Sequence, residues 1–285
     1  MSKNKYFDLI SSIQPDTRTQ LDSILIIDGL NTFLRSFTMI NHINPNGHHI
    51  GGLTGFLKSI GYAIKMLNPT KVIIVFDGVG GSNARRNLYP EYKANRHVNR
   101  MTNYSIFSSK EEETESINNQ MARLIQYLKC LPVTVISIDG LEADDIIAAL
   151  VKKYTNQKIL ILSGDKDFIQ LHRNQLTPSN NHVKQYNPVL NKFVGKGETP
   201  SIYIKEHILK GDRSDGIPNV LSDDDVFIEG RRQRPLTKKK IEAWLNEMVM
   251  TMTPEEQQNY DRNQKLIDLS LIPPEIEAKI YDEFN

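Results

Sequence analysis

Four short apolar runs, rich in β-branched residues, constrain the fold of this chain more than any other feature. Such runs are typical of strands that are buried on both faces of a sheet. The segments between them have helical apolar spacing and good helix formers. Strands that alternate with helices predict an α/β fold with a parallel sheet. The predicted strands are residues 24–27, 72–76, 133–138 and 159–162, and the predicted helices are residues 54–67, 116–128 and 143–154.

The rest of the sequence predicts a second, smaller unit. Around residue 175 the chain becomes rich in turn residues, which indicates edge strands and a crossing loop. After residue 200 the apolar spacing becomes helical again. A length of 285 residues suits one large domain and one small domain. We therefore predict an α/β domain over residues 1–200 and a helical domain over residues 201–285.

Composition narrows the class of protein without selecting a function. With 39% hydrophobic and 24% charged residues the chain has ordinary globular usage, so a packed core is expected. No apolar run approaches the roughly 18 residues of a membrane span, and the N-terminus lacks the apolar core of a signal peptide. A single cysteine, Cys130, excludes an internal disulfide and a cysteine-rich zinc site. We expect a soluble cytoplasmic protein with no membrane partner.

The charges are distributed unevenly along the chain. The formal net charge is only +1, from 35 basic and 34 acidic residues. Residues 71–110 and 230–240 are nevertheless rich in lysine and arginine, whereas residues 241–285 carry ten acidic and three basic residues. Either basic segment alone is more often a solvated face, but two of them in a near-neutral protein are typical of contact with a phosphate backbone. The chain is therefore a candidate for binding nucleic acid.

Each of the four predicted strands ends at acidic residues, and this is the strongest functional signal in the sequence. The carboxyl ends of parallel strands meet at one edge of a sheet, where ligands bind in open α/β folds. One aspartate after a strand is usually a turn or cap residue, but four strands that all end this way are hard to assign to capping. The acids are Asp28 after the first strand, Asp77 after the second, Asp139, Glu142, Asp144 and Asp145 after the third, and Asp165 and Asp167 after the fourth.

So many carboxylates in one cleft require bound cations. Like charges a few ångströms apart repel each other and force some of the acids to protonate. The strand ends offer only oxygen donors, which suits Mg²⁺ or Mn²⁺ rather than Zn²⁺ or copper. Two cations would stabilise the attacking and leaving oxygens of phosphodiester cleavage. A further acidic pair, Asp212 and Asp215, lies in a predicted turn between helices. One interpretation is that the two residues are helix caps. The other is that the turn folds back over the sheet edge and Asp215 completes the second metal site.

Six motifs resemble those of the 5′ nuclease family, the flap endonucleases and 5′–3′ exonucleases that include the N-terminal domain of bacterial DNA polymerase I. The motifs occur in the family's order, cover nearly the whole chain and are together very specific. The phrase ILKGD and the insertion EGRRQRPLTKKK are most similar to the ribonuclease H branch from the T-even phages. The six motifs are IIDGLN at 26–31, VFDG at 75–78, EYKANR at 91–96, LEADDIIA at 141–148, SGDKDFIQL at 163–171 and GDRSDGIPN at 211–219.

The resemblance implies a fold and an activity. The implied fold is a PIN-like parallel sheet with flanking helices, a helical arch or clamp over about residues 80–115, and a small C-terminal domain of the helix-three-turn-helix type. The implied activity is metal-dependent 5′–3′ exonuclease or flap endonuclease cleavage with ribonuclease H activity. It would leave 5′-phosphate products and remove RNA primers and adjacent DNA during phage-type lagging-strand replication. Two Mg²⁺ ions, or Mn²⁺ in their place, would be the cofactors.

Carried onto this sequence, the resemblance divides the acids between two metal sites, with Asp212 behind the second site. In the arch, Lys93 and Arg85 would contact the scissile phosphate, where a cation offsets developing charge. Arg86 and Arg96 would contact nucleic acid nearby; without the motif, all four would be read as solvated loop charges. The implied first site is Asp28, Asp77, Glu142 and Asp144, and the implied second site is Asp145, Asp165, Asp167 and Asp215.

One segment departs from the family pattern. Many members carry a GxGxxT helical hairpin whose backbone amides grip a duplex phosphate, often with a potassium ion. This chain has VLSDDDVFIEGRRQRPLTKKK instead, so neither feature is expected, and Gly216 replaces an asparagine common at the preceding turn. We predict that basic side chains bind the duplex there. The alternative is a solvated loop that leads into a helix. The side chains are Arg231, Arg232, Arg234, Lys238, Lys239 and Lys240.

The expected substrates are RNA/DNA hybrids and duplex DNA with a 5′ end, flap or fork. A single-strand binding protein or a sliding clamp is the expected protein partner, and the chain is expected to be a monomer, in the host cytoplasm if it is phage-encoded. Two alternatives stay open. A PIN-type ribonuclease shares the strand-end acids but is usually shorter and lacks the EYKANR segment. A non-catalytic DNA-structure-binding protein would be expected to have lost some of the acids. A haloacid-type phosphatase is not favoured, because no second acid stands two residues after Asp28.

Overall fold

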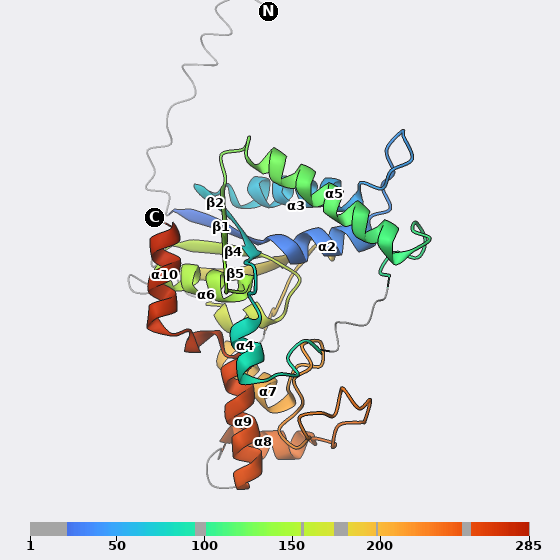
Figure 1. Cartoon of the computed structure of the whole chain (residues 1–285). Helices are drawn as coiled ribbons and strands as arrows, with labels where there is room; N and C mark the ends of the chain where they lie inside the picture. The colour runs from blue at the N-terminus through green and yellow to red at the C-terminus, as the bar shows by residue number, and fades with distance from the viewer. Residues whose placement is uncertain are drawn as a thin grey trace, which may run out of the picture.

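The computed structural model of the chain has an α/β part with a helical part beneath it (Figure 1). The structure describes residues 22–94, 101–154, 157–173, 182–197, 199–246 and 252–284. None of the helices in these ranges combines the length and the apolar character that crossing a membrane requires.

A six-stranded sheet forms the centre of the α/β part, in the order β3-β2-β1-β4-β5-β6. Neighbouring strands are parallel except for β5 and β6, which pair antiparallel. The predicted α/β fold with a parallel sheet is therefore confirmed. The turn-rich segment supplies β5 and β6, of which β6 is at the edge of the sheet, whereas β5 lies between β4 and β6. The strands are β1 (Ser23–Asp28), β2 (Lys71–Asp77), β3 (Thr134–Ile138), β4 (Lys158–Leu162), β5 (His182–Asn187) and β6 (Lys192–Phe193).

The alternation of side chains along β1 divides the core between the two faces of the sheet. Leu25 packs with Phe33 on one face, whereas Ile26 packs with Ile147 on the other. Successive residues of a strand point to opposite faces, so an uninterrupted apolar run requires helices on both. The first face is covered by α2 (Gly29–Met39), α3 (Gly51–Leu67) and α5 (Lys110–Leu128), and the second by α6 (Ala143–Lys153) and α10 (Pro274–Phe284) (Figure 1).

Two of these helices are longer than predicted, and one was not predicted at all. α3 begins three residues and α5 six residues before the predicted first residue, because polar or glycine-rich first turns do not show the apolar spacing. α2 follows β1 directly. Its N-cap is Asp28, whose side chain accepts a hydrogen bond from the Asn31 amide. A residue that ends a strand also starts a helix, and periodicity alone does not reveal this.

The helical part has its own buried cluster, in which Trp244, Leu209 and Leu266 pack together. The chain then returns to the sheet, and Ile280 of α10 is fully buried against α6. A division into domains 1–200 and 201–285 stays a prediction, and α10 packs across it. The remaining elements are α4 (Asn83–Leu88), η2 (Asp167–Leu171), α7 (Pro200–Lys210), α8 (Lys238–Asn246), α9 (Pro254–Ile267) and η3 (Leu269–Leu271).

The segment predicted as an arch, residues 80–115, contains two pieces that pack in different places. The first piece lies against the helical part, where the Tyr89 hydroxyl donates to the Asp224 carbonyl at 2.6 Å. In the second piece, Phe107 stacks on Phe37 of α2 with 5.5 Å between ring centroids. Residues 95–100, which include Arg96, lie outside the described residues.

Candidate active site

The carboxyl ends of β1 and β2 present their last residues, Asp28 and Asp77, at one edge of the sheet. Asp28 accepts hydrogen bonds from the Asn31 amide at 3.2 Å and from the Ser163 hydroxyl at 2.9 Å. Asp77 accepts a hydrogen bond from the amide of Ala143, the first residue of α6, at 2.8 Å. Both carboxylates are thus held by the backbone at strand-to-helix junctions.

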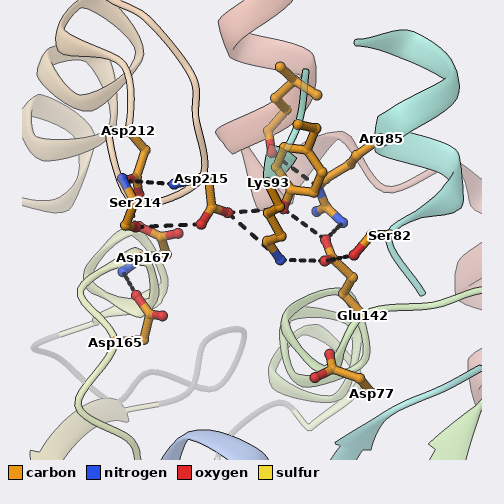
Figure 2. A network of polar contacts seen from close by, with 12 residues as sticks. Asp77, Ser82, Arg85, Lys93, Glu142, Asp165, Asp167, Asp212, Ser214 and Asp215 are labelled. Carbon is orange, nitrogen blue, oxygen red and sulfur yellow. Dashed lines mark hydrogen bonds and ion pairs between the residues drawn. The ribbon is translucent and has the colours of Figure 1, made fainter. Parts of the chain in front are cut away.

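Glu142 is the centre of a polar network that joins α6 to residues 82–93 (Figure 2). Its Oε1 accepts hydrogen bonds from the Ser82 hydroxyl at 2.8 Å and from Lys93 Nζ at 2.5 Å. Its Oε2 accepts hydrogen bonds from Arg85 at 2.6 Å and from the Tyr92 hydroxyl at 3.0 Å. Burial would raise the pKa of Glu142, but Arg85 and Lys93 lower it to about 2. Glu142 is therefore a carboxylate at any physiological pH.

Arg85 binds Asp145 through two hydrogen bonds, of 2.9 Å and 2.7 Å. Burial would lower the pKa of Arg85, but Asp145 and Glu142 raise it above its ordinary value. The structure thus places Arg85, Asp145 and Glu142 in one ion-pair network. A contact of Arg85 with the scissile phosphate, and a place for Asp145 at the second metal site, stay predictions.

Three other acids are destabilised in their charged form. Burial, with repulsion from Asp165 and Asp28, raises the pKa of Asp144 well above its ordinary range. Burial raises the pKa of Asp28 to about 7 in spite of its hydrogen bonds, and Asp165 and Asp77 add repulsion. Burial, with repulsion from Asp165, raises the pKa of Asp167 to about 7. A bound cation relieves this kind of repulsion.

The turn after α7 folds back over the sheet edge and brings Asp212 and Asp215 to the cluster (Figure 2). Asp212 Oδ1 accepts hydrogen bonds from the Ser214 amide and hydroxyl, both at 2.7 Å. Asp215 Oδ2 accepts a hydrogen bond from the Tyr92 hydroxyl at 3.0 Å and lies 3.8 Å from Lys93 Nζ. Tyr92 and Lys93 therefore bridge Glu142 and the turn.

Gly216 makes this turn possible. Its φ of +74° lies in the left-handed region, which glycine adopts freely and asparagine tolerates better than most residues. This explains why glycine can stand where other members of the family have asparagine. Beyond it, the Ile217 amide donates to the Asp212 carbonyl at 2.8 Å and closes the turn.

His207 of α7 lies between two of the acids. Its Nδ1 is 3.5 Å from Asp167 Oδ1, and its Nε2 is 3.5 Å from Asp212 Oδ2. Burial would lower the pKa of His207, but Asp212 and Asp167 raise it. Burial would raise the pKa of Asp212, but His207 and Ser214 lower it. The sequence did not reveal His207 because the predicted ligands were all acids, and His207 stands in the predicted helix before the acidic turn.

Two other residues of the site were not assigned a role from the sequence. Tyr92 is 3% exposed and contacts both Glu142 and Asp215. Ser163 is fully buried and holds Asp28. Tyr92 belongs to the motif EYKANR and Ser163 to the motif SGDKDFIQL. Their positions in these motifs were the sequence signal that could have identified them as site residues.

The donor set fits hard divalent cations. The described acids of the sheet edge and of the turn offer carboxylate oxygens, the ligands that Mg²⁺ and Mn²⁺ prefer. Burial and mutual repulsion raise the pKa values of Asp28, Asp144 and Asp167, so positive charge among them is favourable. Asp167, His207 and Asp212 have donor atoms that all lie within 4.8 Å of one another.

The basic residues predicted to bind nucleic acid are placed differently from one another. Arg86 lines a small open cavity of about 260 Å³ together with Asp77, Lys93 and Glu142, beside the acids. It therefore lies where the sequence predicts a nucleic-acid contact. That contact itself stays a prediction.

The basic stretch of residues 231–240 carries less uncompensated charge than its sequence indicates. Arg231 pairs with Asp223 at 3.0 Å, and Arg234 pairs with the same carboxylate at 3.1 Å. Lys240 pairs with Glu256 at 2.7 Å. A turn brings the acidic run before the stretch alongside Arg231 and Arg234, so part of the positive charge that is predicted to bind a duplex is paired within the protein. No salt bridge within the described part of the chain involves Arg232, Lys238 or Lys239.

Two family models match the chain. The model described as 5′-3′ exonuclease, N-terminal resolvase-like domain, matches residues 23–195, and the model described as T4 RNase H, C terminal, matches residues 198–285. Ribonuclease H of Enterobacteria phage T4 is 33% identical over 245 residues, which cover 80% of this chain and 75% of that protein. A 5′-3′ exonuclease of Buchnera aphidicola subsp. Schizaphis graminum is 33% identical over 209 residues, which cover 71% of this chain and 67% of that protein.

Solved structures from bacteriophage T5 share the fold. A flap endonuclease in a pseudo-enzyme-product complex with DNA and metal ions has a TM-score of 0.62 at 18% identity, covering 92% of this chain and 97% of that chain. A 5′-exonuclease with bound zinc ions has a TM-score of 0.62 at 18% identity, covering 92% of this chain and 98% of that chain. The acid-lined sheet edge, the matched family models and the relatives agree, and the chain belongs to the 5′–3′ exonuclease family and is a nuclease.

Proposed function

We propose that this nuclease hydrolyses RNA and DNA from 5′ ends with two divalent cations and leaves 5′-phosphate products. Mg²⁺ would be the natural cation, with Mn²⁺ able to replace it. RNA/DNA hybrids and duplex DNA with a 5′ end, flap or fork would be the substrates. In the cell the activity would remove RNA primers and adjacent DNA during lagging-strand replication. The name of the phage T4 relative, ribonuclease H, supports an RNA/DNA hybrid as one substrate.

The observation that carries the proposal is the convergence of acids from separate chain segments on one sheet edge. Burial and repulsion destabilise the charged forms of Asp28, Asp144 and Asp167, so a cluster with no ligand would cost the fold free energy. Divalent cations that offset this repulsion can also stabilise the attacking and leaving oxygens of phosphodiester cleavage. We assign Asp28, Asp77, Glu142 and Asp144 to the first cation, and Asp145, Asp165, Asp167 and Asp215 to the second, with Asp212 behind it.

The chain's own residues would orient the acids and supply positive charge. When bound, the cations would lower the pKa of the attacking water and offset charge on the leaving oxygen. Ser163 and the Asn31 amide fix the Asp28 carboxylate. Lys93 Nζ lies between Glu142 and Asp215, at 2.5 Å and 3.8 Å. It can turn toward a phosphate once Glu142 has another counter-charge.

A larger open cavity beside the acids suits a nucleic-acid strand. Its volume is about 670 Å³, and Asp165 and Asp167 form part of its wall. Phe193 and Tyr203 in the lining offer aromatic faces on which bases can stack. Its basic lining residues, suited to a phosphate backbone, are Arg35, Lys166, Lys192 and Arg213. A single-strand binding protein or sliding clamp as partner, a monomeric state and a cytoplasmic location stay predictions from the sequence.

Cleavage of two 5′-labelled substrates tests the proposed function. The protein is incubated with Mg²⁺ and either an RNA/DNA hybrid or a 5′-flap duplex, and the products are sized and their ends identified. We expect short products with 5′-phosphate ends, and no cleavage with EDTA or with Asp144→Asn. Exposed Asp282→Asn, on α10, serves as the matched control and should cleave like wild type. Cleavage that persists in EDTA, or products that carry 3′-phosphate, would contradict the proposal.

A further inference from the structure

α7 adds a nitrogen donor to the cluster of acids, and no sequence motif accounts for it. His207 has a side chain that is only 14% exposed, and its two ring nitrogens each face one carboxylate. With Asp167 and Asp212 it lines the 670 Å³ cavity. The donor atoms of the three residues lie within 4.8 Å of one another. The three therefore form a mixed nitrogen and oxygen group rather than a cluster of acids alone.

The two ring nitrogens of His207 have different surroundings. Nδ1 is buried and has no hydrogen-bond partner among the described residues. Nε2 faces Asp212, whose other oxygen is held by the amide and hydroxyl of Ser214 at 2.7 Å. A carboxylate that fixes one ring nitrogen and leaves the other toward a ligand position is the usual arrangement behind a metal-bound histidine. Asp212 thus orients the ring, and Nδ1 faces Asp167.

The spacing between His207 Nδ1 and Asp167 Oδ1 fits a shared ion better than a direct contact. The two atoms are 3.5 Å apart. His207 Nε2 is equally far from Asp212 Oδ2, but Asp212 hydrogen-bonds the ring, whereas Nδ1 has no hydrogen-bond partner among the described residues. Two ligand atoms that each lie about 2.1 Å from a tetrahedral ion are about 3.4 Å apart.

We propose that His207 Nδ1 and Asp167 together bind one transition-metal divalent cation, of the class of Mn²⁺, Co²⁺ and Zn²⁺, while Asp212 orients the imidazole. The inference rests on the proposed function in one respect, because the ion occupies the second of the two cation positions. Imidazole raises affinity for transition metals relative to Mg²⁺, which prefers oxygen ligands. The second position therefore favours transition metals over Mg²⁺, whereas the oxygen-only first position favours hard cations.

Binding of Co²⁺ to the full-length protein tests this inference without relying on activity. Visible absorption of bound Co²⁺ and isothermal titration calorimetry, both at fixed pH, compare wild type with His207→Gln. Glutamine keeps a polar group near Asp212 but removes the imidazole. We expect Co²⁺ to bind at least about tenfold more weakly at one site, and Mg²⁺ affinity to change by less than about threefold. The matched control is His48→Gln, an exposed histidine outside the cavity, and it should bind Co²⁺ like wild type.

Unchanged Co²⁺ affinity in His207→Gln, or an equal loss of Co²⁺ and Mg²⁺ affinity, would overturn the inference and leave His207 as an ion-pair partner. If the variant does not fold, the ring-nitrogen chemical shifts of wild-type His207 decide instead. A Zn²⁺-dependent shift at Nδ1 supports the inference, and its absence overturns it. The nuclease assay separates the two proposals. Mg²⁺-dependent cleavage without His207-dependent Co²⁺ binding overturns only the metal inference, and the reverse outcome overturns only the proposed function.

Discussion

At the scale of single residues, folding stability and function are in conflict at Asp144. Burial and repulsion from Asp165 and Asp28 disfavour its charged form. Asp144→Asn removes that repulsion, so the metal-free protein should melt at a higher temperature than wild type. Single-turnover cleavage should fall by about 10³-fold or more if Asp144 is a ligand of the first cation, as we propose. Thermal melting in EDTA and single-turnover rates check both parts. Activity within about tenfold of wild type would remove Asp144 from the first site.

Lys93 is the second residue whose role a single substitution can define. Its Nζ lies 2.5 Å from Glu142, in the middle of the acids. If the Lys93 charge acts on the reacting phosphate, as the resemblance implies, Lys93→Ala should lower the single-turnover rate by about 10²-fold to 10³-fold and duplex affinity far less. Lys152→Ala, which breaks a surface pair with Glu277, should change neither quantity. Equal losses in rate and affinity would make Lys93 an ordinary backbone contact.

At the scale of secondary-structure elements, the start of α5 depends on one buried carboxylate. Glu113 is fully buried and accepts hydrogen bonds from the amides of Thr102 and Asn103, both at 2.8 Å, and from Lys110 at 2.7 Å. Burial would raise its pKa, but Lys110 and Thr102 lower it to about 2. Glu113→Gln should therefore cost about 2 to 3 kcal/mol of unfolding free energy in urea at pH 7.

The pH dependence of that loss has a definite sign. The pKa of folded Glu113 lies below its ordinary value of 4.5, so its contribution is complete above about pH 4.5 and is lost as the pH falls toward 2. The difference between wild type and Glu113→Gln should shrink over this range. A difference that stays constant from pH 7 to pH 3 would show that the carboxylate charge is not the cause.

α8 begins at Lys238, and its first turn carries two of the basic side chains of the stretch that have no salt bridge within the described part of the chain. Lys240 is held by Glu256, whereas Lys238 and Lys239 are exposed. Replacing Lys238 and Lys239 together by Ala should flatten the slope of log duplex affinity against log salt by roughly two units. Lys240→Ala is the control, and its slope should match wild type. Coincident lines for wild type and the double variant would show that Lys238 and Lys239 do not contact the duplex. They would then be solvated residues at a helix start, where cations oppose the helix dipole.

At the scale of the whole molecule, α10 ties the helical part to the sheet. Ile280 is fully buried against α6 in the sheet's core cluster. Ile280→Ala should cost about 2 to 5 kcal/mol, whereas Leu271→Ala, at a half-exposed side chain, should cost far less. The single tryptophan, Trp244, reports on the helical part by fluorescence, and circular dichroism reports on the whole chain. Urea transitions seen by the two probes should coincide; separate transitions would show that the two parts unfold independently.

Much of the fold and of the acid cluster could be predicted because both depend on local patterns. A strand buried on both faces must be continuously apolar, so β1, β2 and β4 stand out in the sequence. The carboxyl ends of parallel strands share an edge by geometry, so Asp28 and Asp77 could be placed together before the structure was known. The start of α5 could not be found this way, because Glu113 and its partners are polar residues that cap and anchor the helix.

By itself, the sequence determined that acids gather at a sheet edge, because strand periodicity acts over a few residues, and it predicted cations among them, because like charges at short range repel each other. Only the tertiary structure decided which basic side chain pairs with which carboxylate. Arg85 and Lys93 turn toward Glu142, and His207 enters between Asp167 and Asp212. Arg231 pairs with Asp223 at the surface. Electrostatic energy depends on distances between side chains of different elements, and those distances are set by how helices and turns pack against the sheet.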